Sequence, residues 1–167
     1  MEAPNTLLSN RKTLYSGTGT QPSHVQTAKG NSALETRIQL ERYENDNVVQ
    51  AKQADGASVA YIWGYDQRYI VAQVQNATYA DIEALSSFGS NFVISESLST
   101  TQENALRGLP GVLVTTYTHE PNIGMLSMTD PRGYTTTYEY DDSNRLTRVK
   151  DKDGNILQDY EYNYRGN

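Results

Sequence analysis

Residues 138–151 read Tyr-Glu-Tyr-Asp-Asp-Ser-Asn-Arg-Leu-Thr-Arg-Val-Lys-Asp, and the pattern begins again at residue 160 with Tyr-Glu-Tyr-Asn-Tyr-Arg-Gly-Asn. Alternating aromatic residues followed by a polar turn are typical of a β-strand that leads into a hairpin. A unit that recurs at short intervals cannot bury a core alone and must stack on its neighbours. This stretch therefore predicts an architecture of stacked repeats and does not by itself indicate a reaction.

Tyrosine stands at alternate positions in both units. Such residues lie on one face of a strand, because side chains alternate between the two faces of a sheet. If the strands stack in register, these faces would form tyrosine ladders across neighbouring strands. The residues expected on the two faces are Tyr134, Thr136, Tyr138 and Tyr140 in one strand, and Tyr160, Tyr162 and Tyr164 in the other.

The composition favours a thin sheet with wet faces over a thick core. The chain has 167 residues, and 37% of them are hydrophobic, against about 45–50% in an average globular domain. Much of this apolar content is tyrosine, with 13 Tyr against 2 Phe and 1 Trp. Tyrosine suits a half-buried sheet surface because its ring packs while its hydroxyl reaches water.

Charge and cysteine content exclude several classes of function. The net charge is −6, from 14 basic and 20 acidic residues, which argues against a nucleic-acid partner because phosphate binding needs a positive surface. The chain has no cysteine, so disulfides and thiol chemistry are excluded. No apolar run approaches the roughly 20 residues that span a bilayer, and no signal peptide is visible at the start of the sequence.

The first half of the chain divides into two expected segments. Residues 1–33 are rich in Ser, Thr, Asn, Gly and Gln, which predicts a flexible N-terminal segment with a short extended piece near Leu14-Tyr15. Residues 34–77 predict an antiparallel β-meander, with a hairpin turn at Asp55-Gly56 and a further turn at 66–68.

Residues 78–111 predict a helical insert. Thr78 is followed three residues later by Asp81, which is the spacing of a capping box at the start of a helix. Thr100 and Glu103 have the same spacing and predict the start of a second helix. Residues 112–167 then return to short strands separated by polar turns. The expected fold class is therefore mainly β, an antiparallel β-meander with a short helical insert.

The C-terminal repeats resemble the Rhs/YD-repeat family, whose unit is loosely Gly-x-x-Thr-x-Tyr-x-Tyr-Asp-x-x-Gly-Arg-Leu, followed by Asp-x-x-Gly-Asn and another Tyr-x-Tyr. Asn144 stands where the family has glycine, and asparagine tolerates the same left-handed backbone. Residues 34–77 resemble a more degenerate repeat. The positions that carry the resemblance are Gly133, Thr136, Tyr138, Tyr140, Asp141, Arg145, Leu146, Asp151, Gly154, Asn155, Tyr160 and Tyr162.

The resemblance implies a function as well as a fold. In this family the repeats form a YD-repeat sheet strip that can close into a hollow shell; some shells enclose a toxin, and others lie on the cell surface or are linked to carbohydrate binding. The chain is similar to the C-terminal ends of large Rhs-like proteins of Bacteroidetes-type bacteria. The resemblance implies a non-catalytic structural module, secreted or at the cell surface, whose partners are the remaining repeats or the sheet edge of another chain.

A second hypothesis is binding of a carbohydrate or a cell surface. Tyr61, Trp63 and Tyr65 alternate along one expected strand, and exposed aromatic faces can stack on sugar rings. The competing interpretation is that these three side chains pack beneath the helical insert. Glycans are therefore possible partners under this hypothesis only.

Catalytic and metal-binding sites are not expected. The loop from Asp151 begins like a calcium loop but has Ile156 in place of the required glycine and Tyr162 in place of the required glutamate. Asp130-Pro131 resembles the self-cleavage motif of some Rhs proteins, yet another repeat follows it, which favours an ordinary turn. His119 is expected to be a surface histidine. The sequence thus predicts no catalytic residue, no metal and no cofactor.

Overall fold

The computed structural model describes residues 8–17 and 19–163. In these residues eleven β-strands form one sheet, and each strand pairs antiparallel with its neighbours in the sequence. The expected mainly β fold with an antiparallel meander is therefore confirmed. The strands are β1 (Ser9–Tyr15), β2 (Pro22–Lys29), β3 (Glu35–Glu44), β4 (Asn47–Gln53), β5 (Ser58–Gly64), β6 (Tyr69–Gln75), β7 (Leu113–Glu120), β8 (Gly124–Thr129), β9 (Thr135–Tyr140), β10 (Leu146–Lys150) and β11 (Ile156–Asp159).

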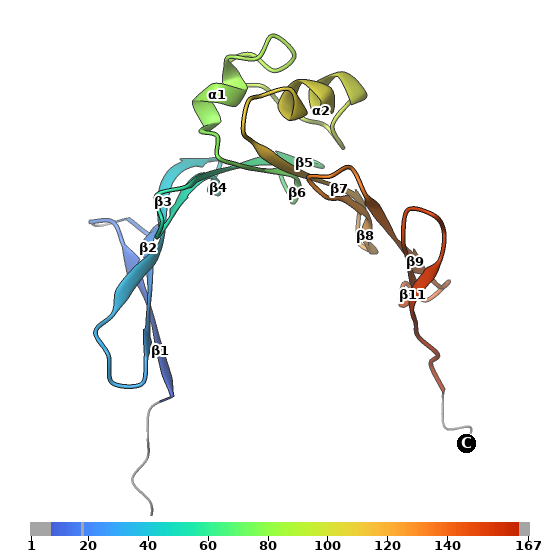
Figure 1. Cartoon of the computed structure of the whole chain (residues 1–167), viewed down its shortest axis with the longest axis horizontal. Helices are drawn as coiled ribbons and strands as arrows, with labels where there is room; N and C mark the ends of the chain where they lie inside the picture. The colour runs from blue at the N-terminus through green and yellow to red at the C-terminus, as the bar shows by residue number, and fades with distance from the viewer. Residues whose placement is uncertain (1–7, 18, 164–167) are drawn as a thin grey trace, which may run out of the picture.

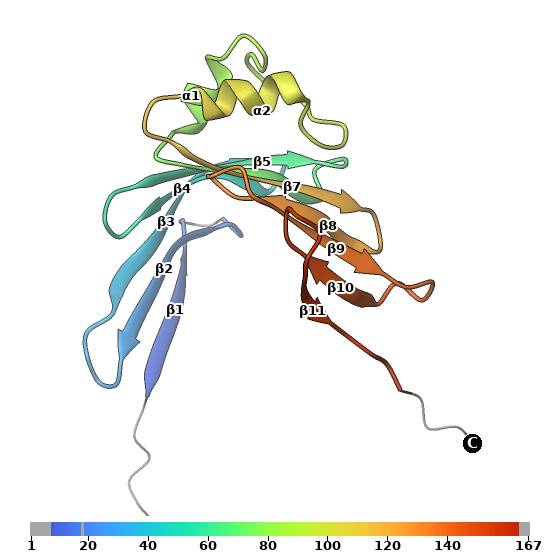
Figure 2. The ribbon, with the colours of Figure 1, turned by 45° about the vertical axis from the view of Figure 1, so that its right-hand side comes forward.

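The sheet curves into an arch whose two ends are β1 and β11 (Figure 1). Two short helices, α1 (Tyr79–Glu83) and α2 (Thr100–Arg107), lie between β6 and β7 in the sequence. Both views place them on the convex side of the arch, over the central strands (Figure 2). The middle of the sheet is therefore covered on its convex face, while the two ends of the arch have no helix over them among the described residues.

The helix starts follow the capping chemistry expected from the sequence, with one shift. Thr78 caps α1, and its side chain and that of Asp81 form the expected reciprocal hydrogen bonds. The cap of α2 is Ser99, with Gln102 in the box position, so the prediction of Thr100 and Glu103 is wrong by one residue. Ser-x-x-Gln satisfies the same free N–H groups as Thr-x-x-Glu, and the two motifs overlap here, so the sequence alone does not decide between them.

Two strands lie within residues 1–33, which the sequence predicted to be flexible. β1 and β2 pair along their whole length, from Ser9 opposite Lys29 to Tyr15 opposite Pro22. β1 is exposed at nearly every position, so it lacks the apolar alternation that marks a strand in sequence. Its order comes from the backbone hydrogen bonds to β2, which do not depend on side-chain polarity. The expected flexible segment is therefore corrected for residues 9–15 and 22–29, and residues 1–7 lie outside the described part of the chain.

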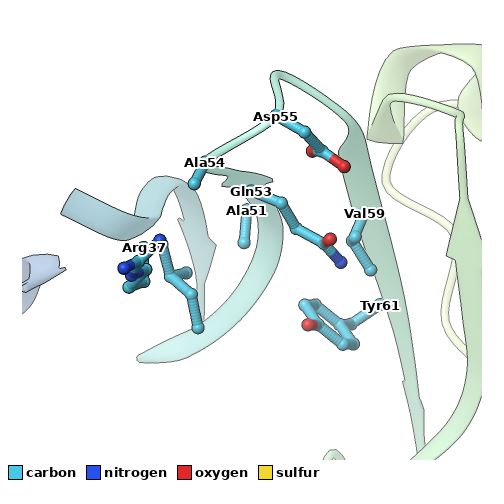
Figure 3. A pocket seen from close by; sticks show the side chains of 8 residues that line it. Arg37, Ala51, Gln53, Ala54, Asp55, Val59 and Tyr61 are labelled. Carbon is cyan, nitrogen blue, oxygen red and sulfur yellow. The ribbon is translucent and has the colours of Figure 1, made fainter. Parts of the chain in front are cut away.

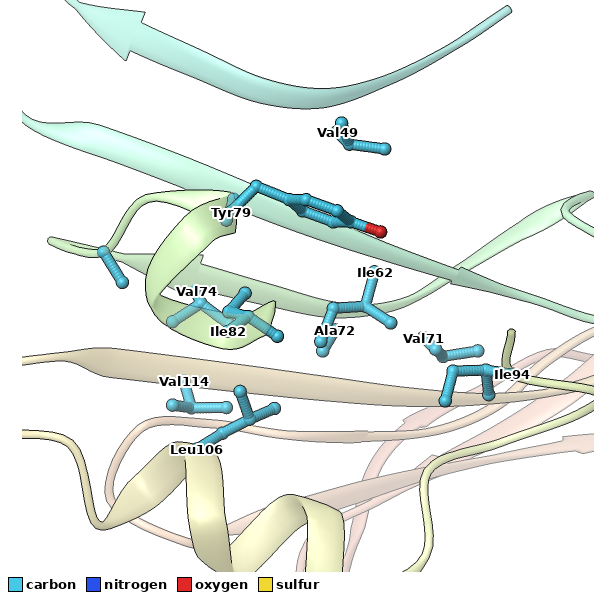
Figure 4. Close-up of a cluster of buried hydrophobic side chains, with 12 residues drawn as sticks. Val49, Ile62, Val71, Ala72, Val74, Tyr79, Ile82, Ile94, Leu106 and Val114 are labelled. Atoms are coloured by element: carbon cyan, nitrogen blue, oxygen red, sulfur yellow. The ribbon is translucent and has the colours of Figure 1, made fainter. Parts of the chain in front are cut away.

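The hydrophobic core lies between the central strands and the helical insert. It joins side chains of β4, β5, β6 and β7 to Tyr79 and Ile82 of the first helix, Ile94 of the connecting loop and Leu106 of the second helix (Figure 4). Ile62, Ile82 and Leu106 are fully buried. The insert thus supplies the second layer that a single sheet needs in order to bury an apolar face.

Candidate functional site

Three turns between β8 and β11 share one hydrogen-bond pattern, and each begins with an aspartate, namely Asp130, Asp141 or Asp151. The backbone N–H of each aspartate donates to the carbonyl oxygen four residues later. Its carboxylate Oδ1 accepts hydrogen bonds of 2.8 to 3.0 Å from the amides of the second and fourth residues that follow. The repeated aspartate therefore closes each hairpin of the repeat by binding the free N–H groups of its own turn.

The fourth residue of each turn has a left-handed backbone. Gly133 and Gly154 have φ angles of 83°, and Asn144 has a φ of 60°. Glycine adopts this conformation without steric cost and asparagine tolerates it. Asn144 therefore has the left-handed backbone that was expected where the family has glycine.

Arg145 and Asn155 reinforce two of these turns with their side chains. Arg145 donates Nε and Nη2 hydrogen bonds to Asp141 Oδ2, which together with the backbone amides lowers the pKa of Asp141 to about 2. The guanidinium also lies 4.6 Å from the centre of the Tyr162 ring. Asn155 Nδ2 donates to Asp151 Oδ2 at 2.9 Å and lowers the pKa of that carboxyl group. Five positions that match the family pattern thus build these two turns, namely Asp141, Arg145, Asp151, Gly154 and Asn155.

Three tyrosines of the sheet donate hydrogen bonds to backbone carbonyl oxygens. Tyr140 Oη donates to the carbonyl oxygen of Met125 at 2.9 Å, and Tyr162 Oη donates to that of Leu146 at 2.8 Å. Tyr43 Oη donates in the same way to Pro22 at 2.6 Å. In all three cases the acceptor lies at the start of an earlier strand, β8, β10 or β2. Tyr140 and Tyr43 therefore fasten their strand to the strand before it, and Tyr162 fastens the segment after β11 to β10.

The expected tyrosine ladder does not form between Tyr138 and Tyr160. β10 lies between their segments, and the register places Val149 opposite Tyr138 and Gln158 opposite Val149. Tyr160 follows β11, donates to Gln158 Oε1 at 2.6 Å and is 42% exposed. Tyr164 lies outside the described residues.

A different row of tyrosines crosses the concave face. Ile62 and Thr116 contact the core and helix α2 respectively, so their chain neighbours Tyr61 and Tyr117 point to the opposite, concave side. Burial raises the pKa of Tyr117, and the nearby phenols of Tyr61 and Tyr138 raise it further. The three rings come from β5, β7 and β9, and this proximity was missed because it depends on strand register.

Tyr61 also lines a groove with a volume of about 390 Å³ (Figure 3). The groove has both apolar and polar walls, and its polar side chains belong to Arg37, Gln53 and Asp55. Burial raises the pKa of Tyr61 above its ordinary value, and its phenol can donate a hydrogen bond. The groove can accommodate a small polar ligand beside an aromatic ring.

Trp63 and Tyr65 lie apart from this groove. The register of β5 and β6 shifts between Ile62 and Trp63, which interrupts the alternation that the sequence predicted. Trp63 Nε1 donates to the carbonyl oxygen of Val48 at 2.8 Å. Both side chains pack against the core cluster under the insert, in line with the competing interpretation. A binding role therefore stays a prediction that rests on Tyr61.

His119 belongs to a ring cluster with Tyr65 and Tyr69. Its imidazole stacks on the Tyr69 ring at a centroid distance of 4.8 Å and meets the Tyr65 ring edge-on at 5.8 Å. Its backbone N–H donates to Tyr65 Oη at 3.0 Å. The expected surface histidine is thus half-buried, and its Nδ1 is buried without a hydrogen-bond partner among the described residues. The cluster joins the β5–β6 turn to the end of β7.

The free energy of unfolding should decrease as the pH falls below about 6.5. Burial lowers the pKa of His119, so the unfolded chain takes up a proton that the folded chain resists. The stability is fully present above the unfolded pKa and is lost as the pH falls toward the folded pKa. Urea titrations at pH values from neutral to mildly acidic would measure this loss.

His119→Phe should weaken this pH dependence, because phenylalanine can stack on Tyr69 but does not titrate. His24→Phe makes the same exchange on β2, outside the ring cluster, and should keep the wild-type dependence. If His119→Phe and wild type lose stability in parallel over this pH range, the buried imidazole is not the cause.

Two further properties concern the described residues as a whole. Among residues 8–17 and 19–163, no helix has the length and apolar character required to cross a bilayer. The same residues contain no group of three or more His, Asp or Glu side chains placed to hold a metal ion.

One family model and several solved structures are similar to this chain. The family model described as RHS Repeat matches residues 124–156. The crystal structure of TcdB2-TccC3 matches with 13% identity and a TM-score of 0.44, and the same complex without its hypervariable C-terminal region matches with 13% identity and a TM-score of 0.45. The Tc holotoxin pore of Photorhabdus luminescens matches with 11% identity and a TM-score of 0.39. Each alignment covers 90% of this chain and 8% of the other chain.

No match is found among curated proteins. The matched residues 124–156 begin with β8 and extend to the first residue of β11, so they contain all three aspartate turns. The family match and the turn geometry thus identify the same segment. Residues 124–156 thus match the model of the family that the tyrosine–aspartate pattern resembles.

Proposed function

We infer that this chain is a non-catalytic structural module, one piece of a secreted or surface-associated Rhs-like shell protein. The observation that carries the proposal is that each of the two end strands is paired on one side only among the described residues. Among the described residues, β1 pairs only with β2, and β11 pairs only with β10. An edge strand with free N–H and C=O groups is a template for another strand. The arch therefore has two edges, at β1 and β11, where further strands can extend the sheet (Figure 1).

The side chains at both ends support the same function. Leu8, just before β1, and Tyr15, its last residue, are 82% and 57% exposed. Ile156 and Leu157 of β11 are 55% and 57% exposed. Apolar side chains this exposed would be covered if neighbouring repeats continued the sheet. The deep core, in contrast, lies under the insert at the centre of the arch.

The purified chain should associate as its concentration rises, because its uncovered edges can pair with those of other copies. Light scattering over a concentration series measures the association, and hydrogen exchange locates it. As the concentration rises, the backbone amides of β1 and β11 should be the first to become protected from exchange. The amides of β5 and β6 should be protected at every concentration. A chain that stays monomeric, with freely exchanging edge amides at all concentrations, would contradict the proposal.

A second candidate is binding of a carbohydrate or a cell surface through the concave groove. The observation that favours it is the placement of Tyr61 beside the polar side chains of Arg37, Gln53 and Asp55. An aromatic ring with flanking hydrogen-bond donors and acceptors suits a sugar. This candidate needs an uncovered concave face. Strands added at the edges of the sheet would leave that face uncovered, so the two candidate functions are compatible.

A further inference from the structure

A row of charges with alternating sign crosses the last three strands. The register places Glu139 opposite Arg148, and Arg148 opposite Asp159. Arg148 Nε lies 3.2 Å from Asp159 Oδ1, and its Nη1 lies 4.0 Å from Glu139 Oε2. Lys150 Nζ also binds Glu139. From β9 to β11, the row therefore reads acid, base, acid.

The row ends on Asp159 at the edge of the sheet. The Asp159 side chain is 64% exposed, and its ion pair with Arg148 lies on the inner side only. β11 has no second neighbour among the described strands (Figure 2). Asp159 thus lies on the edge strand with an exposed carboxylate, beside the residue that a further strand would place opposite it.

Cross-strand charges restrict what can occupy that position. Opposite charges that face each other on adjacent strands stabilise the pair, and like charges destabilise it. Pairing of two copies through β11 would bring together two acidic edges, because Glu161 follows Asp159 closely in the sequence and is also exposed. The strand that already fits β11 is β10, which offers Arg148 to Asp159.

We propose that the outer edge of β11 is a docking surface for an antiparallel strand that places a lysine or arginine opposite Asp159, with the charge pattern of β10. This proposal rests on the proposed function, which requires strand addition at the edge, and adds the chemistry of the partner strand. Ile156 and Leu157 supply the apolar contacts, the backbone of β11 supplies the hydrogen bonds, and Asp159 supplies the selection for a basic partner.

The test uses the whole chain, labelled for NMR, and a synthetic peptide that copies residues 144–151. A second peptide carries the Arg148→Glu exchange and is otherwise identical. The first peptide should shift the amide signals of β11 and bind roughly twofold to fivefold more tightly than the second, which is the range for a cross-strand ion pair. The amide of Tyr160, which donates to Thr147, reports whether β11 stays paired with β10.

The matched control is Asp159→Asn, which removes the charge and keeps a hydrogen-bond acceptor. On this variant the two peptides should bind equally. If both peptides bind equally to wild-type β11, the edge accepts strands but the selection for a basic strand is overturned. If neither peptide affects β11, strand addition at this edge fails as well. If β11 signals shift with the concentration of the chain alone, and shift equally in Asp159→Asn, strands of a second copy pair there regardless of charge and the selection for a basic partner is overturned.

Discussion

Ile62→Ala should lower the free energy of unfolding by about 2–5 kcal/mol. Ile62 is fully buried at the centre of the core cluster, between the sheet and the insert. Truncation removes buried apolar surface and leaves a cavity that the packed surroundings fill only in part. Urea titration followed by circular dichroism would measure the change.

The matched control is Ile156→Ala, which makes the same exchange on β11. Ile156 is 55% exposed, so the expected loss is below about 0.5 kcal/mol. Equal losses at the two sites would mean that the insert does not form the principal core of the chain. Together the two variants test whether stability is concentrated at the centre of the arch.

This distribution of stability is consistent with the proposed structural role. A module that is extended at its edges needs a part that folds without its neighbours, and the insert provides that part by covering β4, β5, β6 and β7. The end strands lack such a cover among the described residues. They are held by backbone hydrogen bonds, the aspartate turns and the tyrosine bonds to preceding strands. The ends are therefore the part that a partner strand would stabilise most.

The C-terminal part of the fold could be predicted from the sequence because its information is local. An aspartate followed three residues later by glycine or asparagine specifies a turn whose hydrogen bonds lie within five residues. Asp141 with Asn144 and Asp151 with Gly154 fold as this rule requires. The Thr78 cap is local in the same sense.

The N-terminal strands were missed because β1 has no alternation of apolar and polar side chains. β1 contains Arg11 and Lys12 and is exposed on both faces. A sequence indicates a strand through the alternating apolar residues of its buried face. A strand whose two faces are both exposed to solvent lacks this alternation. The pairing of β1 with β2 depends on backbone geometry instead.

The candidate site could be predicted only in part, because it depends on register and on contacts between distant residues. One irregularity between Ile62 and Trp63 separates Tyr61 from Trp63 and Tyr65. The stacking of His119 on Tyr69 joins residues that are far apart in the sequence. Tyr117 lies between Tyr61 and Tyr138 only because β7 falls between their strands in the sheet order. A single sequence contains no direct signal for any of these.

Gly64→Ala should destabilise the chain by about 3 kcal/mol, the upper part of the usual range for overpacking. Gly64 ends β5 at the point where the insert loop meets the sheet. A methyl group at this position would overlap the backbone carbonyl oxygen of Glu96 and lie 2.7 Å from Val71 Cγ1. A backbone atom cannot rotate away as a side chain can, so the loop itself would have to move.

The measurement should separate a displaced insert from a general loss of stability. Trp63 packs against the core cluster, so its fluorescence reports the contact between sheet and insert, while circular dichroism reports the strands. Gly108→Ala is the control, because the added methyl group would meet its nearest neighbour, the Asn104 carbonyl oxygen, at 3.3 Å, and Gly108 has a φ of −78°. Its expected effect is below about 1 kcal/mol. If Gly64→Ala changes neither signal, the close approach of Glu96 does not hold the insert in place. If it changes the fluorescence first, the insert detaches from a sheet whose strands remain paired, and the hydrophobic cover is then separable from the repeat sheet itself.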